Sequence, residues 1–574
     1  MRWIIISNQI HIALLGNCTT NYISNALKEI CSQYGILAEI YNAPFNQYTQ
    51  EALSPNSGLN LSDPELIILF LEGKYLFPDW FDMKAILSDK EHKLQLIQDT
   101  FDSIESLVDS IHSTRNVKII INNFHVPYHT PLGILDNKNC LGLKRMLNTL
   151  NLKLEEWAIS KDYLHIFDYN GFCSHVGRRS IEDEKLSYST KSPISISSTK
   201  EIVKEYMRFI LPLKSKNKKC LVLDLDNTLW GGIAGEDGIA GIKLDIDGPS
   251  KTFYDFQQEI LNLYHRGILL AVNSKNNFED AIEIIENHPH MLLRKSCFSS
   301  LKINWKDKVT NLREIAKELN IGIDSLVFFD DNPVEREYVK LALPEVTVVE
   351  VPKDSCRYVQ VLKAIVEFEQ LNITSEDTKR NRMVEENKKR LELFSKLNDL
   401  EDYLTSLQTK VIVEFANEFN IPRLAQLTQK TNQFNMTTSR YQSEEIENMI
   451  KTGNFLVFFC SVSDRFGDSG TIGVCIVRLD SAAAFIDTFL LSCRVLGRNV
   501  EYAFLNAVTE ILKKKGIQKI SSKYIQTAKS KANQDFYRNA GFDQHCTSDQ
   551  ETEFLLTEFK NLRNINYIDT SIIV

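Results

Sequence analysis

The feature that most constrains the fold is a short apolar strand that ends in two closely spaced acids. The run from Leu223 to Gly232 reads Leu-Asp-Leu-Asp-Asn-Thr-Leu-Trp-Gly-Gly, and Val222 belongs to the apolar stretch before it. Side chains two residues apart in an extended segment point the same way, so Asp224 and Asp226 leave the strand end together. A buried pair of like charges is costly unless a metal or a reaction uses it. The pattern therefore predicts a divalent cation and a phosphoryl group at this strand end.

Three later segments add polar groups in a similar setting. Residues 268–274 form an apolar run that ends in a hydroxyl, and residues 304–308 supply a lysine just before a helical pattern. Residues 326–333 form another apolar run, which ends in two acids. Strands that alternate with helical segments predict an α/β fold with a Rossmann-like, doubly wound parallel sheet. Ligands bind at the carboxyl ends of the strands in such sheets.

These four segments, in this order, resemble the four motifs of the haloacid dehalogenase (HAD) superfamily of phosphatases and phosphotransferases. The run from Leu221 to about Pro352 resembles one branch, the FkbH-like proteins, through DLDNTLWGGIAGEDG, SKNN, INWKDK and FFDDNPVERE. The resemblance implies that Asp224 is the nucleophile that forms an aspartyl-phosphate, and that Asp226 is the general acid and base.

The resemblance also implies that Ser274 and Lys308 hold phosphoryl oxygens. Lys306 is the alternative to Lys308, and Asp-Asn and Asp-Asp-Asn-Pro are also common as helix caps and turns. The implied metal shell contains only oxygen ligands, for which Mg²⁺ is the default ion. Its members are Asp224, Asp226, Asp330 and Asp331.

The spacing of the segments predicts an open site. Between Asp226 and Ser274 there is room for a glycine-rich flap, residues 231–248, and one helix that ends near Arg266. Between Ser274 and Lys308 there is room for one helix and one short strand. A separate cap domain needs on the order of 50 residues or more. An open site suits phosphates on large partners or on a long flexible arm.

The FkbH-like resemblance implies a specific reaction, in which a glyceryl unit passes from 1,3-bisphosphoglycerate to the phosphopantetheine thiol of an acyl carrier protein for polyketide-type biosynthesis. The alternatives are a HAD phosphatase for a small phosphoester and a non-catalytic docking component of an assembly line. Asn273 stands where many FkbH-like proteins have a cysteine. A thioester sulfur must then come from elsewhere, with Cys297 and Cys493 as candidates, or the carrier thiol attacks directly.

Residues 1–210 are similar to the SGNH hydrolase fold, as in the FkbH-like branch. The expected Gly-Asp-Ser reads Gly-Asn-Cys and ends at Cys18, and Phe172 stands where the acid before His175 is expected. We predict a scaffold or docking domain, with a Cys18/His175 hydrolase as the alternative, and an exposed polar loop over residues 178–198. The predicted strands are Ile10–Leu15, Leu66–Leu71, Val117–Ile121 and Leu164–Phe167.

The C-terminal part resembles the GNAT acyltransferase fold, an α+β arrangement. Its loop after a long strand resembles the loop that binds coenzyme A pyrophosphate at a helix N-terminus, which implies binding by Arg494, Gly497 and Arg498. Asn499 replaces the last small residue of that motif. Coenzyme A and the carrier arm share phosphopantetheine, so this domain would seat the arm; the alternative is a domain that packs and binds nothing.

Composition limits the partners and the compartment. The net charge of −9 argues against nucleic acid. Eleven cysteines without metal-site spacing favour reduced thiols in the cytoplasm. Lysine runs at 214–219 and 513–515 are solvated surface or docking sites for an acidic carrier. The apolar stretches are shorter than the ~18 residues of a membrane span. The predicted parts are an SGNH-like domain (1–210), a HAD domain (215–370), a connecting helix (371–400) and a GNAT-like domain (401–574).

Overall fold

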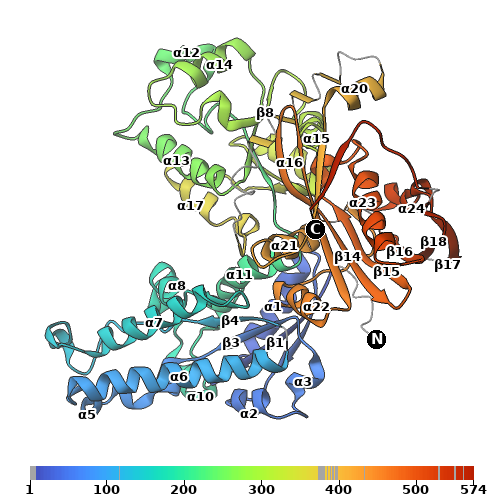
Figure 1. Cartoon of the computed structure of the whole chain (residues 1–574). Coiled ribbons are helices and arrows are strands. Elements are labelled where there is room, and N and C mark those ends of the chain that lie inside the picture. The colour runs from blue at the N-terminus through green and yellow to red at the C-terminus, as the bar shows by residue number, and fades with distance from the viewer. Residues whose placement is uncertain are drawn as a thin grey trace. The chain divides into compact units, whose positions relative to one another are not determined.

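In the computed structural model the chain forms two compact units, residues 1–214 and 215–574 (Figure 1). Most of both units is described, and the gaps lie mainly between residues 373 and 398. The described residues are 8–115, 117–372, 382–383, 386–387, 389–390, 393–394, 399–431, 433–527, 530–548, 551–559 and 562–573.

A parallel sheet in the order β2-β1-β3-β4-β5 forms the centre of the N-terminal unit. β1, β3 and β4 are almost wholly buried, because helices cover both faces of the sheet (Figure 1). The four predicted strands are confirmed. The edge strand β2 was not predicted, because its Leu-Ala-Glu-Ile-Tyr-Asn run is only partly apolar and partly exposed. The strands are β1 (Gln9–Gly16), β2 (Leu37–Asn42), β3 (Leu66–Phe70), β4 (Lys118–Asn122) and β5 (Leu164–Phe167).

The prediction of an exposed loop over residues 178–198 is wrong. This segment forms two short helices and the start of a long one, and both Ile181 and Ile194 are buried. The serines of this segment favour a loop in the sequence. At least one of them is a helix cap, because Ser195 accepts a hydrogen bond from the Ser198 backbone at the start of the long helix. The longer helices are α1 (Asn21–Gln33), α6 (Lys90–Thr114), α7 (Leu143–Ile159), α8 (Tyr169–Val176) and α11 (Ile196–Leu213). The shorter ones are α2 (Tyr48–Leu53), α3 (Gly58–Ser62), α4 (Gly73–Leu76), α5 (Met83–Ile86), α9 (Arg178–Ile181) and α10 (Glu184–Thr190).

A second parallel sheet, in the order β10-β9-β6-β7-β8, lies in the region predicted as the HAD domain. In β6, Leu221 and Leu223 belong to one hydrophobic core, and Cys220 and Val222 belong to another. Alternate side chains therefore fill two cores, one on each face, as a doubly wound sheet requires. The strands are β6 (Cys220–Leu223), β7 (Leu269–Ser274), β8 (Phe298–Ile303), β9 (Leu326–Phe329) and β10 (Thr347–Val348).

The helices of this region leave no space for a cap domain. α12 (Ala234–Gly241) and α13 (Lys251–His265) fill the first interval, and α14 (Phe278–Asn287) precedes β8 in the second. Both intervals consist wholly of described residues, and the spacing argument is confirmed there. The remaining α-helices are α15 (Lys308–Glu318), α16 (Pro333–Ala342) and α17 (Tyr358–Lys363).

The C-terminal part contains a mixed sheet in the order β17-β18-β16-β15-β14-β13-β11-β19. β13, β14 and β15 are antiparallel neighbours, whereas β15 and β16 run parallel with α23 between them, as in the expected GNAT-like α+β arrangement. The strands are β11 (Lys410–Phe415), β12 (Phe434–Asn435), β13 (Phe455–Asp464), β14 (Gly467–Asp480), β15 (Ala483–Leu491), β16 (Lys519–Ile525), β17 (Asp543–Thr547), β18 (Glu551–Leu556) and β19 (Asp569–Ile573). The α-helices are α20 (Leu400–Ser406), α21 (Ile421–Lys430), α22 (Ser443–Thr452), α23 (Val500–Lys514) and α24 (Phe536–Ala540).

Most of the predicted connecting helix, residues 371–400, lies outside the described residues.

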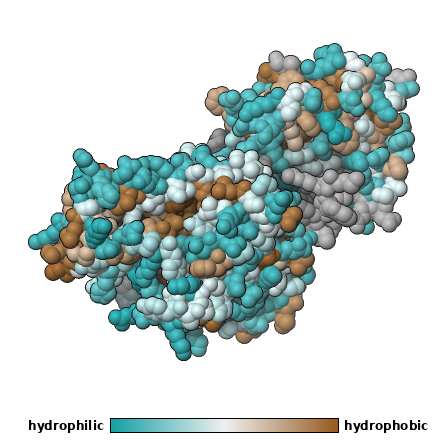
Figure 2. All heavy atoms as spheres, turned by 90° about the horizontal axis from the view of Figure 1, so that it is seen from below, coloured by the Kyte–Doolittle hydropathy of each residue, from teal (hydrophilic) through white to brown (hydrophobic). Residues whose placement is uncertain are grey.

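Figure 2 shows one face of the molecule, on which apolar groups gather in a band among hydrophilic side chains. Large apolar side chains that are exposed in the N-terminal unit include Leu61, Ile134 and Ile159. Among the described residues, no helix is both long enough and apolar enough to cross a membrane.

Candidate functional site

Three acids meet at the carboxyl ends of two neighbouring strands of the second sheet. Asp224 follows β6, and Asp330 and Asp331 follow β9, which is paired with β6 in parallel. The Asp224 backbone N–H continues this pairing by donating to the Phe329 carbonyl at 3.0 Å. One carboxylate oxygen from each acid lies within 4.8 Å of the others. We call Asp224, Asp330 and Asp331 the carboxylate group.

Lys308 is the cation of this site. It opens α15, which Asp307 caps, and its Nζ lies 2.9 Å from Asp224 Oδ1 and also contacts Asp330. Burial alone would lower the pKa of Lys308, but the carboxylates of Asp224 and Asp330 outweigh this and raise it. Lys306, the alternative from the sequence, is exposed and pairs with Glu314 at 3.0 Å.

The carboxylate group has more negative charge than Lys308 can balance. Three ionised carboxylates and one ammonium leave two negative charges in a largely buried site. Accordingly, burial and the Asp224 charge raise the pKa of Asp330, and the same two causes raise the pKa of Asp331 to about 6. A divalent cation would remove this imbalance, and an all-carboxylate donor set is hard, so the residues present fit Mg²⁺.

Asp226 lies outside the carboxylate group, although the sequence analysis included it in the metal shell. Its Oδ1 accepts from Trp230 Nε1 and from the Ala234 backbone, both at 3.0 Å, and its Oδ2 accepts from Asn276 Nδ2 at 2.9 Å. Burial raises the pKa of Asp226, and these three donors oppose the rise. The three N–H donors thus orient the Asp226 carboxylate. Its catalytic role stays a prediction.

Two asparagines that the sequence analysis did not assign organise the end of β7. Ser274 is buried there, and Asn276 Nδ2 lies 3.3 Å from its Oγ. The fully buried Asn273 donates from Nδ2 to the Lys308 carbonyl at 2.9 Å and accepts from Asn311 at 3.0 Å. Asn273 therefore links β7 to the first turn of α15, whose first residue is Lys308. The signal in the sequence was the run of amide residues at and just after the end of the strand.

Arg336 supports the loop that carries Asp330 and Asp331. It is buried on α16 and donates from Nη1 to the carbonyl oxygens of both acids, each at 2.8 Å. Asn332 also donates its backbone N–H to Asp330 Oδ1 at 2.9 Å. These bonds link the backbone of the acidic loop to α16. The sequence offered only an arginine within the first turn of a helix as a hint.

Of the two candidate thioester cysteines, Cys297 lies away from this site. Cys297 comes just before the first residue of β8, so it is at the amino end of the sheet, opposite the carboxylate group. At about 3.3 Å per residue, the six-residue strand separates the two ends by roughly 20 Å. Burial also raises the pKa of the Cys297 thiol, which disfavours the thiolate. The side chain of Cys493 lies outside what the structure describes.

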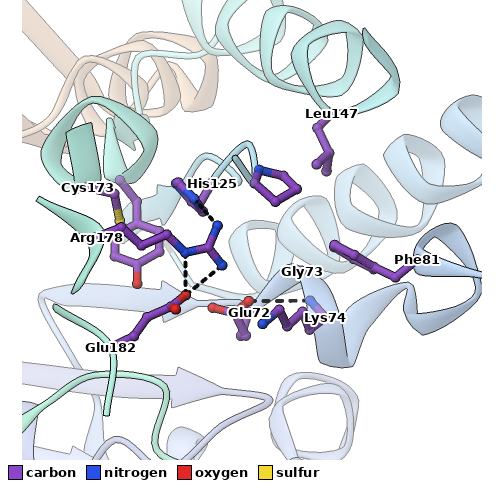
Figure 3. Close-up of a pocket in the computed structure, with 11 residues that line it drawn as sticks. Glu72, Gly73, Lys74, Phe81, His125, Leu147, Cys173, Arg178 and Glu182 are labelled. Carbon is purple, nitrogen blue, oxygen red and sulfur yellow. Dashed lines mark hydrogen bonds and ion pairs between the residues drawn. The ribbon is translucent and has the colours of Figure 1, made fainter. Parts of the chain in front are cut away.

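The N-terminal unit has a pocket at the carboxyl ends of its own sheet (Figure 3). Figure 3 shows Arg178 between His125 and Glu182; its guanidinium donates to His125 Nε2 at 2.6 Å and contacts Glu182 at 2.7 Å. Burial and the nearby Arg178 charge lower the pKa of His125 to about 4, and burial raises the pKa of Glu72. The cavity is about 20 Å³, which is room for about one water. The pocket therefore holds paired charges and little free volume.

The structure does not favour a Cys18/His175 hydrolase. Cys18 is 1% exposed, and burial and the Glu72 charge raise the pKa of its thiol well above the usual value. His175 is exposed on α8, whereas His125 lines the pocket. A neutral buried thiol is a poor nucleophile.

In the GNAT-like part, the predicted coenzyme A loop lies before α23. Arg498 is only 5% exposed and donates to Asp464 Oδ2 at 2.7 Å and to the Arg494 carbonyl at 3.0 Å. Gly497 has a φ of +79°, and Asn499, with a φ of 60°, is the N-cap of the helix. Binding by Arg494, Gly497 and Arg498 stays a prediction, and the Arg498 guanidinium is engaged by Asp464.

Comparisons with known proteins bear on both units. Residues 11–210 match the family described as FkbH, N-terminal domain. The crystal structure of the N-terminal part of BF1531 from Bacteroides fragilis, which contains a phosphatase domain complexed with Mg, is 30% identical with a TM-score of 0.58. The match covers 63% of this chain and 95% of that one. The chain belongs to the FkbH family. Its central domain is a HAD-type phosphatase or phosphotransferase domain.

Acetyltransferase structures match a smaller share of the chain. The ribosomal-protein-S18-alanine N-acetyltransferase from Escherichia coli is 13% identical with a TM-score of 0.20, covering 25% of this chain and 90% of that one. The PaiA N-acetyltransferase from Thermoplasma acidophilum, solved in complex with coenzyme A, is 16% identical with a TM-score of 0.20, covering 26% and 99%. A search of curated proteins finds no match.

Proposed function

We propose that this FkbH-family protein is a Mg²⁺-dependent enzyme that loads a glyceryl unit from 1,3-bisphosphoglycerate onto the phosphopantetheine thiol of an acyl carrier protein. The observation that carries the proposal is the largely buried carboxylate group beside Lys308, at a strand end with no cap domain in the two intervals 227–273 and 275–307, all of whose residues are described. Such a site suits phosphoryl chemistry on a substrate that a large partner must also reach.

The proposed roles follow from position and charge. Asp224, the member of the carboxylate group that directly follows the central strand β6, attacks phosphorus, as the HAD resemblance implies. Lys308 and Ser274 hold the phosphoryl oxygens as charge moves onto the leaving oxygen. Mg²⁺ held by Asp224, Asp330 and Asp331 would offset the charge of the phosphate and so permit an anionic nucleophile.

Asp226 is the proposed acid and base. Burial raises its pKa, which favours a proton on the carboxyl group, and three N–H donors keep its orientation. The proton goes to the leaving oxygen when Asp224 takes the phosphoryl group. The carboxylate then removes a proton from the water that attacks the aspartyl-phosphate and releases inorganic phosphate.

The overall reaction releases two phosphates. The phosphoester at the third carbon is cleaved by water through Asp224. At the first carbon, a thiol sulfur attacks the acyl carbon, the bond between that carbon and the phosphate oxygen breaks, and inorganic phosphate leaves with the proton of the thiol as the thioester forms. Asn273 has no thiol, and Cys297 lies at the other end of β8. We propose that the carrier thiol attacks directly, with Cys493 as the alternative sulfur.

The experiment is the intact mass of a holo carrier protein after incubation with the enzyme, Mg²⁺ and freshly generated 1,3-bisphosphoglycerate. The expected result is a glyceryl-sized gain with wild type and none with Asp224→Asn. An apo carrier without the phosphopantetheine arm is the matched control. A gain that persists in Asp224→Asn would overturn the role of the carboxylate group.

A second candidate function is a phosphatase for a small phosphoester, and the open carboxylate group favours it too. In that case phosphate would be released from several small phosphoesters at the same rate with and without carrier, and the carrier mass would not change. If the protein were instead a non-catalytic docking component, wild type would neither load the carrier nor release phosphate, and both activities would be the same in Asp224→Asn.

A further inference from the structure

Trp305 lies in the loop between β8 and α15, at the carboxyl end of the same sheet as the carboxylate group. Its side chain is 71% exposed. A single exposed apolar side chain is ordinary on a protein surface, so exposure alone carries little weight. The position and the anchoring of this indole are what set it apart.

The indole is linked to both sides of the site. Lys308, which contacts Asp224, follows Trp305 by three residues and opens the helix that Asp307 caps. On the other side, the indole Nε1 donates to Asn277 Oδ1 at 3.1 Å. Asn277 directly follows Asn276, which donates to Asp226. The ring is therefore held between the β7–α14 and β8–α15 loops, which also carry polar groups of the site.

The hydrogen bond determines which part of the indole can meet a ligand. It occupies the only polar atom of the ring, so an added group would meet the apolar ring faces. Because the anchor limits the rotation of the side chain, contact with a ligand costs less conformational entropy than contact with a free tryptophan. Phe278 follows Asn277 as the first residue of α14 and is 42% exposed, so a second aromatic side chain is exposed near this loop in the sequence.

We propose that the ring of Trp305 positions the acceptor arm, a flexible chain of methylenes and amides that ends in a thiol, at the carboxylate group; this rests on the proposed function. The polar groups of the site account for the phosphoryl end of the reaction. No cap domain lies in either interval to hold the arm beside the strand ends, and the exposed ring of Trp305 offers a surface there. Flat amides and methylenes pack well on an indole face.

The test compares Trp305→Ala and Trp305→Phe with Phe419→Ala, which removes an aromatic side chain that is 97% exposed in the C-terminal part. We expect Trp305→Ala to raise the KM for holo carrier about tenfold, as for a residue central to an interface. Phosphate release from acetyl phosphate without carrier should change less than twofold. Trp305→Phe should recover part of the loss, and Phe419→Ala should match wild type.

A second readout does not require carrier loading. Saturation-transfer NMR with free pantetheine should show contact with wild type and a clear loss in Trp305→Ala. No contact with wild type, an unchanged carrier KM in Trp305→Ala, or an equal loss with acetyl phosphate would each overturn the proposal. If wild type binds pantetheine through Trp305 but loads no glyceryl unit, the choice of acyl donor is wrong and the role of Trp305 stands.

Discussion

Two parallel sheets of this chain carry ionisable side chains at their carboxyl ends, and they use them in different ways. In the N-terminal pocket, Arg178 lies between His125 and Glu182, so the charges are paired and the cavity is small. In the central site, Lys308 balances only part of the carboxylate group. Similar sheets thus give a self-neutralised pocket and a site that needs a cation, which shows that side chains, not the fold, decide the chemistry.

The largest expected effect comes from removing Lys308 from the central site, and removing Arg178 from the N-terminal pocket is the comparison. Lys308→Met should lower phosphate release by at least about 10³-fold, because charge stabilisation is lost. It should also destabilise the metal-free protein by about 3–5 kcal/mol, because Asp224 and Asp330 lose their buried partner. Arg178→Met is the matched variant and should change phosphate release less than twofold. Turnover and urea unfolding measure both effects, and equal losses in the two variants would remove the distinction.

Metal binding should also separate the two regions. Mg²⁺ at 100 times its Kd is expected to stabilise wild type by about 2.7 kcal/mol. Asp331→Asn should lose most of this effect, whereas Glu72→Gln in the N-terminal pocket should retain it. Thermal unfolding with and without Mg²⁺, and with EDTA to abolish phosphate release, provides the measurement. A Mg²⁺ shift that survives in Asp331→Asn would place the ion elsewhere.

The third effect concerns the link from β7 to α15. Asn273→Ala leaves the Lys308 carbonyl without its buried donor, so kcat should fall about 10- to 100-fold through misplacement of Lys308. The free energy of unfolding should fall by about 1–3 kcal/mol. Asn287→Ala, at the exposed end of α14, is the control. Steady-state kinetics on a small phosphoester would show an unchanged kcat if Asn273 had no positioning role.

Acid should act on the two regions in opposite directions. The pKa of His125 is lowered to about 4, so the folded state binds fewer protons than the unfolded state, and stability falls as pH drops from about 6.5 to 4. The pKa of Asp331 is raised to about 6, so in metal-free protein its contribution to stability grows as pH drops from about 6 to 4. Denaturant midpoints at pH 6.5 and 4.5 should show a weaker acid loss in His125→Gln and a stronger one in Asp331→Asn. The same midpoint change in both variants would contradict this assignment.

The smallest effect is expected from Cys18, the residue at the predicted nucleophile position of the N-terminal unit. Cys18→Ser should leave carrier loading and phosphate release within twofold of wild type, since the thiol is buried and neutral. Iodoacetamide should not modify Cys18 in the folded protein, because the thiol is buried. Peptide mass analysis would show this. Rapid labelling of Cys18 would mean that this site opens and would weaken the contrast with the carboxylate group.

Local sequence patterns predicted most strands of the two parallel sheets and the acids that follow β6 and β9. Apolar runs that end in polar residues are local patterns, so β6, β7 and β9 and the polar side chains at their ends were found from neighbouring residues alone. The edge strand β2 and the helices of residues 178–198 were missed, because partly exposed or serine-rich segments lack a clear apolar period.

Tertiary structure decided which of these groups meet. Lys308 rather than Lys306 reaches Asp224, Asp226 turns toward N–H donors, and His125 rather than His175 lines the N-terminal pocket. Each of these outcomes depends on loops from different strands, brought together when the strands pair. Local periodicity contains no information on such contacts, because their geometry arises only when the cores on both faces of each sheet are packed.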